Sequence, residues 1–108
     1  MESRILDKNE WSGELVRLSR LMRGKDVMVE VEALNLGDQM EAESVPLRGL
    51  SYDEKDDVVQ LWVGEMDHMI RHPQRIEIAV EKDRLISIYI IDAEGEQHQI
   101  RPLEEVLV

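Results

Sequence analysis

The sequence contains no cysteine, no phenylalanine and only a few aromatic residues of other kinds. The lack of cysteine excludes disulfides, thiolate metal sites and thiol catalysis, and it fits a reducing compartment. Without phenylalanine, the core must be built mainly from aliphatic side chains and methionine. The shortage of aromatic rings also leaves little surface for base stacking.

Long apolar runs are absent as well. No stretch approaches the roughly 18 residues of a membrane span, and the N-terminus MESRILDKNE has no apolar signal core. Positive charge is scarce, since 13 Lys and Arg stand against 24 Asp and Glu, for a net charge of -11. We therefore expect a cytoplasmic protein without membrane contact, and the charge disfavours nucleic acid as a partner.

What the chain does contain predicts one folded domain over residues 1–108, because 43% of its residues are hydrophobic and they occur along the whole length. A helix is expected at about residues 7–23. Asp7 and Glu10 have capping-box spacing, and apolar residues then recur at helical intervals, at Trp11, Leu15, Leu18 and Met22. Gly13 lies inside this pattern and suggests a close helix-to-sheet contact.

From Asp26 the apolar period changes to two, which predicts strands. Short connections without intervening helices favour a mainly β fold: a small antiparallel Sm-like barrel, or a strongly curled sheet of five to six strands, over about 26–103 with a short tail. Leu36 to Asp38 reads as a turn, and Pro46 indicates a bulge or an edge. The expected strands lie at 26–33, 39–47, 58–64, 75–81, 85–92 and 97–102.

The segment SYDEKDD, Ser51 to Asp57, crowds four carboxylates into five positions. A helix-loop-helix calcium site would need a glycine after Asp57 and an acid or amide where Lys55 stands. Asp is common in turns because its side chain bonds nearby backbone amides. We therefore predict a solvated turn between strands.

The segment MDHMIRHP offers a second candidate site, a transition-metal site at Asp67, His68 and His72, with His98 approaching from the last strand. Two histidines four apart suit a metal on a helix, but Pro73 and the flanking strands favour a loop. We expect no metal and no cofactor here. No serine lies in a G-x-S-x-G turn and no phosphate-binding glycine loop occurs, so an enzyme is not expected.

Arg17, Arg20 and Arg23 gather near the end of the expected helix, and Arg71 and Arg75 could join them. Such a cluster could contact phosphates, but cations also complement a helix C-terminus without any ligand. These arginines are the RNA-binding candidates of an alternative function.

The chain resembles a family of small bacterial proteins defined only as a domain of unknown function. The family elements are a P-L-x-G-[IL]-S-Y-D-x-K-D-D segment, an H-x-I-x-x-P segment and a D-A-[DE]-G turn. This sequence supplies them at 46–57, 68–73 and 92–95, and the resemblance covers roughly Trp11 to Leu103. It implies no activity.

The expected architecture is also similar to the Sm-like small barrels, which form rings and often bind RNA, although their sequence motifs are not reproduced. Our leading hypothesis is a noncatalytic protein-interaction or assembly module, and the alternative is an Sm-like RNA binder. Leu85 to Asp92 is apolar on both faces, so we predict a homo-oligomer, most simply a dimer, that covers this strand or the apolar C-terminal tail.

Overall fold

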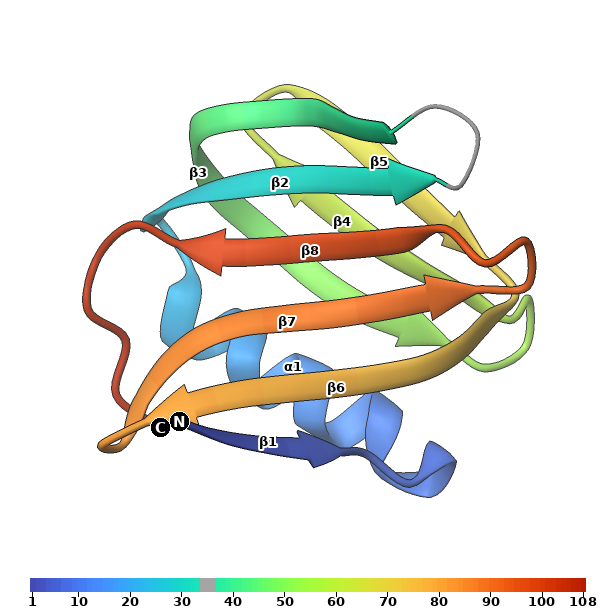
Figure 1. Ribbon diagram of the computed structural model, residues 1–108, viewed down its shortest axis with the longest axis horizontal. Helices are drawn as coiled ribbons and strands as arrows, with labels where there is room; N and C mark the ends of the chain where they lie inside the picture. Colours follow the sequence, from blue (N-terminus) through green and yellow to red (C-terminus); the bar gives the residue numbers. More distant parts are fainter. Residues whose placement is uncertain (34–36) are drawn as a thin grey trace.

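A computed structural model describes residues 1–33 and 37–108, without the side chains of residues 37–41. Eight strands form one antiparallel sheet in the order β1-β6-β7-β8-β2-β3-β4-β5 (Figure 1). The strands are β1 (Glu2–Ile5), β2 (Asp26–Ala33), β3 (Gly37–Asp53), β4 (Val58–Val63), β5 (Met66–Arg71), β6 (Pro73–Glu81), β7 (Arg84–Asp92) and β8 (Gln97–Pro102).

The long strand β3 folds the sheet into two layers. Its first part pairs with β2 up to Pro46, and its second part pairs with β4 from Leu47 onward. The expected irregularity at Pro46 is therefore confirmed, because the partner strand changes there and a register shift follows between Leu47 and Gly49. The turn predicted at residues 36–38 begins outside the described residues.

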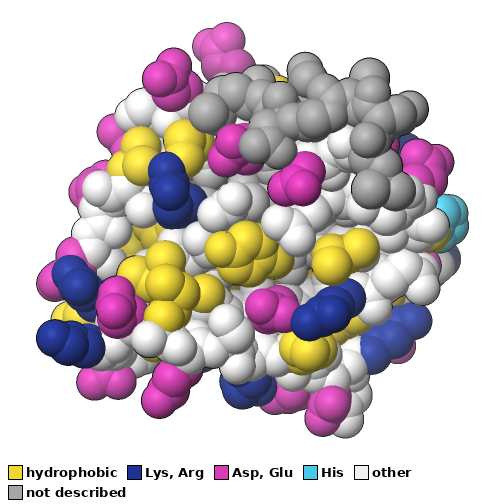
Figure 2. All heavy atoms as spheres, in the orientation of Figure 1, with side chains coloured by type: hydrophobic (Ala, Val, Ile, Leu, Met, Phe, Trp, Pro, Cys, Tyr) yellow, Lys and Arg dark blue, Asp and Glu magenta, His cyan; other side chains and the backbone are white. Residues whose placement is uncertain are grey.

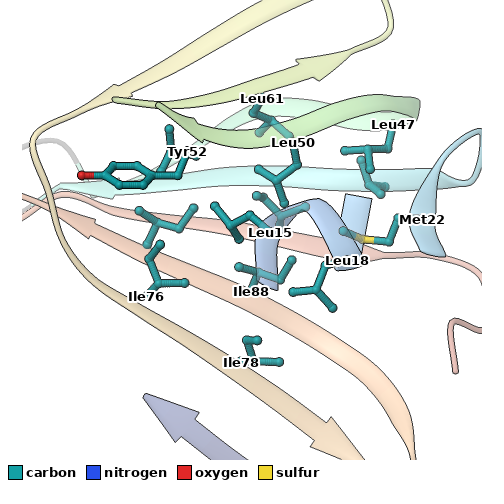
Figure 3. Close-up of a cluster of buried hydrophobic side chains, with 14 of the residues drawn as sticks. Leu15, Leu18, Met22, Leu47, Leu50, Tyr52, Leu61, Ile76, Ile78 and Ile88 are labelled. Atoms are coloured by element: carbon teal, nitrogen blue, oxygen red, sulfur yellow. The ribbon is translucent and has the colours of Figure 1, made fainter. Parts of the chain in front are cut away.

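The predicted helix is confirmed as a 3-10 turn, η1 (Lys8–Glu10), followed by α1 (Trp11–Met22). The capping box is present, since Asp7 N donates to Glu10 Oε1 at 3.1 Å. Helix α1 places Leu15, Leu18 and Met22 between the two layers of the curled sheet (Figure 3). The buried hydroxyl of Ser19 accepts a hydrogen bond from Leu50 N at 3.0 Å, which ties the helix to β3.

The prediction of a mainly β antiparallel fold with one N-terminal helix is confirmed, but the barrel alternative and the count of five to six strands were wrong. The sheet has eight strands and stays open, because β1 and β5 lie at its opposite ends. The two strands that the sequence did not suggest are these end strands. The loop expected at MDHMIRHP is instead β5, where Ile70 is buried and Asp67 and Met69 are exposed.

One further expectation needs correction. Gly13 makes no close contact with the sheet, since a Cβ atom built there would meet nothing within 4 Å. The C-terminal tail folds back onto the β6–β7 turn, where Leu85 N donates to Val106 O and Val108 N donates to Asp83 O. Val106 is buried as a result, while Leu107 stays exposed. Both termini lie side by side next to β1 (Figure 1).

Candidate functional site

A chain of hydrogen bonds joins two histidines and a carboxylate beside the turn between β7 and β8. His98 Nε2 lies 2.9 Å from Asp92 Oδ2, and His98 Nδ1 lies 3.0 Å from His68 Nε2. Glu96 Oε2 lies 3.9 Å from His98 Nε2. Only 5% of the His98 side chain is exposed, so its ring depends on these partners for polar contacts.

Local backbone geometry fixes this cluster. Asp92 Oδ1 accepts hydrogen bonds from the backbone N–H groups of Glu94 and Glu96, at 2.9 and 3.0 Å, so the β7–β8 turn orients the carboxylate. His98 points inward from β8 because its strand alternates buried and half-buried residues. His68 reaches the same point from β5, so the contact joins both layers of the sheet.

The metal candidates predicted from MDHMIRHP do not come together. Asp67 is exposed and faces away from its neighbour His68, as strand alternation requires. His72 lies beyond the end of β5, where its side chain is 67% exposed and its Nδ1 lies 3.3 Å from Asp57 Oδ2. The approach of His98 to His68 is found in the structure, whereas Asp92 and Glu96 were not among the candidates.

The predicted turn at SYDEKDD is present, since residues 54–57 form a turn and Asp53 Oδ1 accepts hydrogen bonds from the backbone N–H groups of Lys55 and Asp56. Asp57 does more than expected. Its Oδ1 accepts a 2.7 Å hydrogen bond from the hydroxyl of the buried Tyr52, whose ring packs edge-on against Trp11. The segment therefore anchors the core as well as reversing the chain.

The ionisation of this pair follows from its surroundings. The hydrogen bond from Tyr52, supported by His72, lowers the pKa of Asp57 below its ordinary 3.8. Burial, together with the hydrogen bond to Asp57, raises the pKa of Tyr52 to about 12. Tyr52 thus stays a neutral donor and Asp57 a charged acceptor over the whole neutral range.

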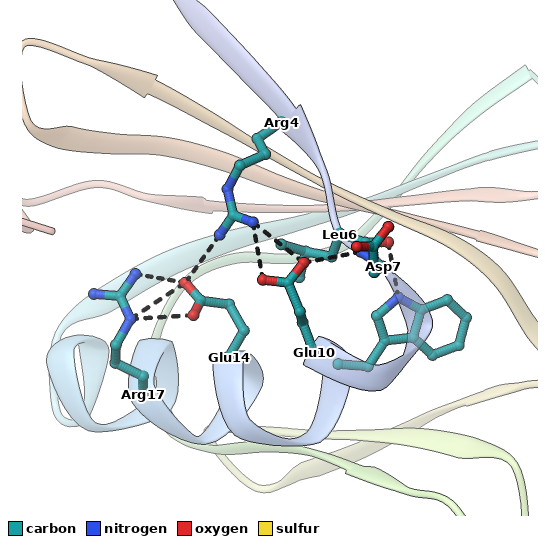
Figure 4. A network of polar contacts seen from close by, with 7 residues as sticks. Arg4, Leu6, Asp7, Glu10, Glu14 and Arg17 are labelled. Carbon is teal, nitrogen blue, oxygen red and sulfur yellow. Dashed lines mark hydrogen bonds and ion pairs between the residues drawn. The ribbon is translucent and has the colours of Figure 1, made fainter.

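The arginines proposed for RNA binding differ in their surroundings. Arg17 Nε donates to Glu14 at 3.2 Å, and this hydrogen bond raises the pKa of the Arg17 guanidinium. Arg4 of β1 lies 3.9 Å from the same Glu14 carboxylate and 3.2 Å from that of Glu10 (Figure 4). Arg20 and Arg23 are exposed, Arg71 is exposed on β5, and Arg75 pairs with Glu77 at 2.7 Å. Carboxylates therefore compete with any phosphate for Arg17 and Arg75.

Strand β1 is the second candidate, because all four of its residues are exposed. It pairs with β6, and across the described residues 1–33 and 37–108 no strand lies on its other side. A hollow of about 410 Å³ on the helix side is lined by Arg4, Arg17, Ile78 and Val80, among others. Another, of about 400 Å³, involves Met1, Ser3, Tyr89 and Ile91. β1 is thus a free sheet edge flanked by partly apolar surface.

The sheet face in front of α1 carries hydrophobic side chains near its middle, surrounded by acidic and basic ones (Figure 2). Tyr89 and Ile91, which belong to the outer side of β7, are half-buried. Ser87 on the same side is buried, so the outer face of β7 is partly covered within one chain. No helix in the described part of the chain is long and apolar enough to cross a membrane.

Comparison with known proteins gives a family and no activity. The chain is 36% identical over 102 residues to an uncharacterized protein from Aquifex aeolicus (strain VF5), a match that covers 94% of this chain and 92% of the relative. No solved structure matches. Residues 2–105 match the family of unknown function DUF5335, and the chain therefore belongs to that family.

Proposed function

We propose that this protein is a noncatalytic self-assembly module that forms a twofold dimer by pairing β1 with β1 of a second copy. The observation that supports this proposal is that β1 is an exposed sheet edge, and that the segment MESRI, which consists of Met1 and β1, is complementary to itself in antiparallel orientation. Edge strands with free backbone groups pair readily with another chain. The dimer would extend the sheet continuously across the twofold axis.

The backbone of β1 presents the correct groups for this pairing. Leu6 N donates to Ile76 O, and this contact continues the register in which Arg4 lies opposite Ile78. In an antiparallel ladder, alternate residues direct both N–H and C=O to the same neighbour. The backbone N–H and C=O groups of the even-numbered residues point toward β6, so those of Ser3 and Ile5 point toward the free edge.

The charges of Glu2 and Arg4 favour one register of the β1–β1 pair. A twofold axis at Ser3 pairs Ser3 with the partner's Ser3 through the outward backbone groups, and it sets Glu2 opposite the partner's Arg4. Moving the axis to Glu2 or to Arg4 would place like charges directly opposite each other, which is destabilising. The register centred on Ser3 is therefore the favoured one.

The same register pairs the apolar ends of the segment. Met1 and Ile5 are 75% and 56% exposed in a single chain. In the dimer, Met1 of each copy would lie against Ile5 of the other copy. A short strand pair buries less surface than the roughly 1,200 Å² of a standard interface, unless the neighbouring hollows are filled as well. We therefore expect a weak dimer, with a dissociation constant of roughly tens of micromolar, because standard-sized interfaces already extend to the micromolar range and this one is smaller.

Charge reversal tests the register. Glu2→Arg sets arginine opposite the partner's Arg4, and Arg4→Glu sets Glu2 opposite glutamate, so each variant alone should be monomeric in sedimentation velocity at low salt. An equimolar mixture of the two variants should form a heterodimer, because each new charge then meets its opposite. This rescue also controls for the contacts that Arg4 makes with Glu10 and Glu14 within one chain.

The proposal would be overturned if the wild-type chain were monomeric at about 100 µM, because that protein concentration exceeds the dissociation constant expected for so small an interface. A Glu2→Arg variant that dimerises as the wild type does would also overturn it, since the contact would then lie elsewhere, for example on the outer face of β7. We make no second proposal, because the open eight-stranded sheet and the paired Arg17 give the RNA-binding alternative no added support.

A further inference from the structure

We propose that Asp92, Glu96 and His98 form a binding site for a divalent transition-metal ion of the zinc class. One ligand atom of each residue lies within 4.8 Å of the other two. An imidazole nitrogen with two carboxylate oxygens is a ligand set that zinc accepts, and a water molecule would complete the coordination. The inference rests on this cluster alone and does not depend on the β1 dimer.

The distances suit a metal after small movements. Ligand atoms bound tetrahedrally at about 2.0–2.1 Å from zinc lie about 3.3 Å from one another. The distance from His98 Nε2 to Asp92 Oδ2 is 2.9 Å and that to Glu96 Oε2 is 3.9 Å. Each oxygen would therefore shift by about half an ångström, and the side chain of Glu96 can do so because it lies at the surface with 35% of its area exposed.

The surroundings hold two of the ligands in place. The backbone N–H groups of Glu94 and Glu96 bind Asp92 Oδ1, which leaves Oδ2 for the metal. With a metal on Nε2, His98 carries its proton on Nδ1 and donates it to His68 Nε2, 3.0 Å away. A histidine ligand commonly donates its second N–H in this way, and the contact fixes its tautomer and orientation.

Access and burial also fit a metal site. Side-chain exposure rises from 5% at His98 and 11% at Asp92 to 35% at Glu96. An ion could therefore enter past Glu96 and reach a nitrogen held in a largely dry environment. A bound ion would join β7, the turn and β8 and, through His68, the β5 strand of the other layer.

Isothermal titration of zinc chloride into chelator-treated full-length protein, near neutral pH, tests the site. We expect one ion per chain, and we expect Glu96→Gln to weaken binding roughly tenfold or more, as the loss of a ligand should. Glu94→Gln is the matched control, because it removes the same charge from the same turn without removing a ligand. It should change the affinity by less than about twofold, as expected for an exposed charge.

Histidine ring resonances identify the nitrogen that binds. Zinc should move the Nε2 resonance of His98 in ¹⁵N-resolved spectra and leave His72 unchanged, which separates this cluster from the His72–Asp57 pair. The proposal is wrong if no saturable zinc binding occurs, or if Glu96→Gln and Glu94→Gln lower the affinity for zinc equally. It is also wrong if zinc moves the His72 resonance instead of the His98 resonance.

Discussion

At the scale of single residues, Asp57 shows how a turn residue can also serve the core. The carboxylate accepts the hydroxyl of the buried Tyr52 and lies beside His72, while its neighbour Asp56 is exposed. Both aspartates belong to the same turn, and sequence alone predicts equal, minor roles for them. The structure separates them, because neutralising the acceptor of a buried hydroxyl weakens a charge-assisted hydrogen bond, which costs more than removing an exposed charge.

We predict that Asp57→Asn lowers the melting temperature clearly at neutral pH, whereas Asp56→Asn leaves it nearly unchanged. The pKa of Asp57 is lowered in the folded protein, so its stabilising contribution is present above the ordinary value of 3.8 and is lost as pH falls through the folded-state pKa. The difference between wild type and Asp57→Asn should therefore shrink on acidification below about pH 4. Thermal melts over an acid pH series measure it, and equal melting temperatures at neutral pH would contradict the role assigned to Asp57.

The candidate sites could be predicted in part from the sequence. Spacing and residue type indicated the turn at SYDEKDD, and they drew attention to His68 and to an approach by His98. They could not indicate Asp92 and Glu96, because the curl of the sheet decides that β5 and the β7–β8 turn meet. The sequence signal for that cluster, an Asp, a Glu and a His within one hairpin, is short and resembles an ordinary polar turn.

At the scale of elements, the alternation of buried residues decided what could be predicted. The helix and six strands carry strong apolar periods, and the structure contains all of them. Strand β1 is exposed at each residue. Strand β5 alternates in burial, but it has a histidine at the inward position 68 and a methionine at the outward position 69, so its apolar residues show no period of two. End strands of a sheet depend on pairing with a neighbour for their conformation, and pairing cannot be seen in local sequence.

Two glycines give opposite predictions for these elements. Gly13→Ala should raise the free energy of unfolding by about 0.5–1 kcal/mol, because the position is helical and a methyl group meets open space. Gly49→Ala should lower it by about 1–3 kcal/mol, because the new Cβ would lie 2.9 Å from the Trp62 ring at the bend of β3. Urea unfolding of both variants decides the matter, and a destabilised Gly13→Ala would show that the helix needs the glycine.

At the scale of the whole molecule, the open sheet shows that the barrel, one of the two predicted architectures, was wrong. A closed barrel would pair its two end strands, but here α1 supplies the apolar surface that fills the space between the layers. Each end strand therefore keeps one free edge within the described part of the chain. The strongly acidic surface can limit nonspecific association by repulsion, so pairing at β1 depends on local complementarity.

Removal of the C-terminal tail should lower the stability of the fold without changing the affinity of the dimer. A chain ending at Glu104 loses Val106, which is 2% exposed and accepts a backbone hydrogen bond from Leu85. Burying a valine contributes about 1.5–3 kcal/mol, so we expect the free energy of unfolding to fall by about 2 kcal/mol. The dissociation constant of the dimer should change little, because the proposed contact is made by Met1 to Ile5.

Light scattering coupled to gel filtration, alongside urea unfolding, measures both quantities on the full and shortened chains. The substitution Val106→Ala separates loss of the buried side chain from loss of the last residues, and it should reproduce most of the destabilisation. A shortened chain that stays folded but becomes monomeric would place the tail in the contact, since Val108 lines the hollow beside β1. The contact would then include the apolar tail, and β1 pairing alone would be insufficient to hold two copies together.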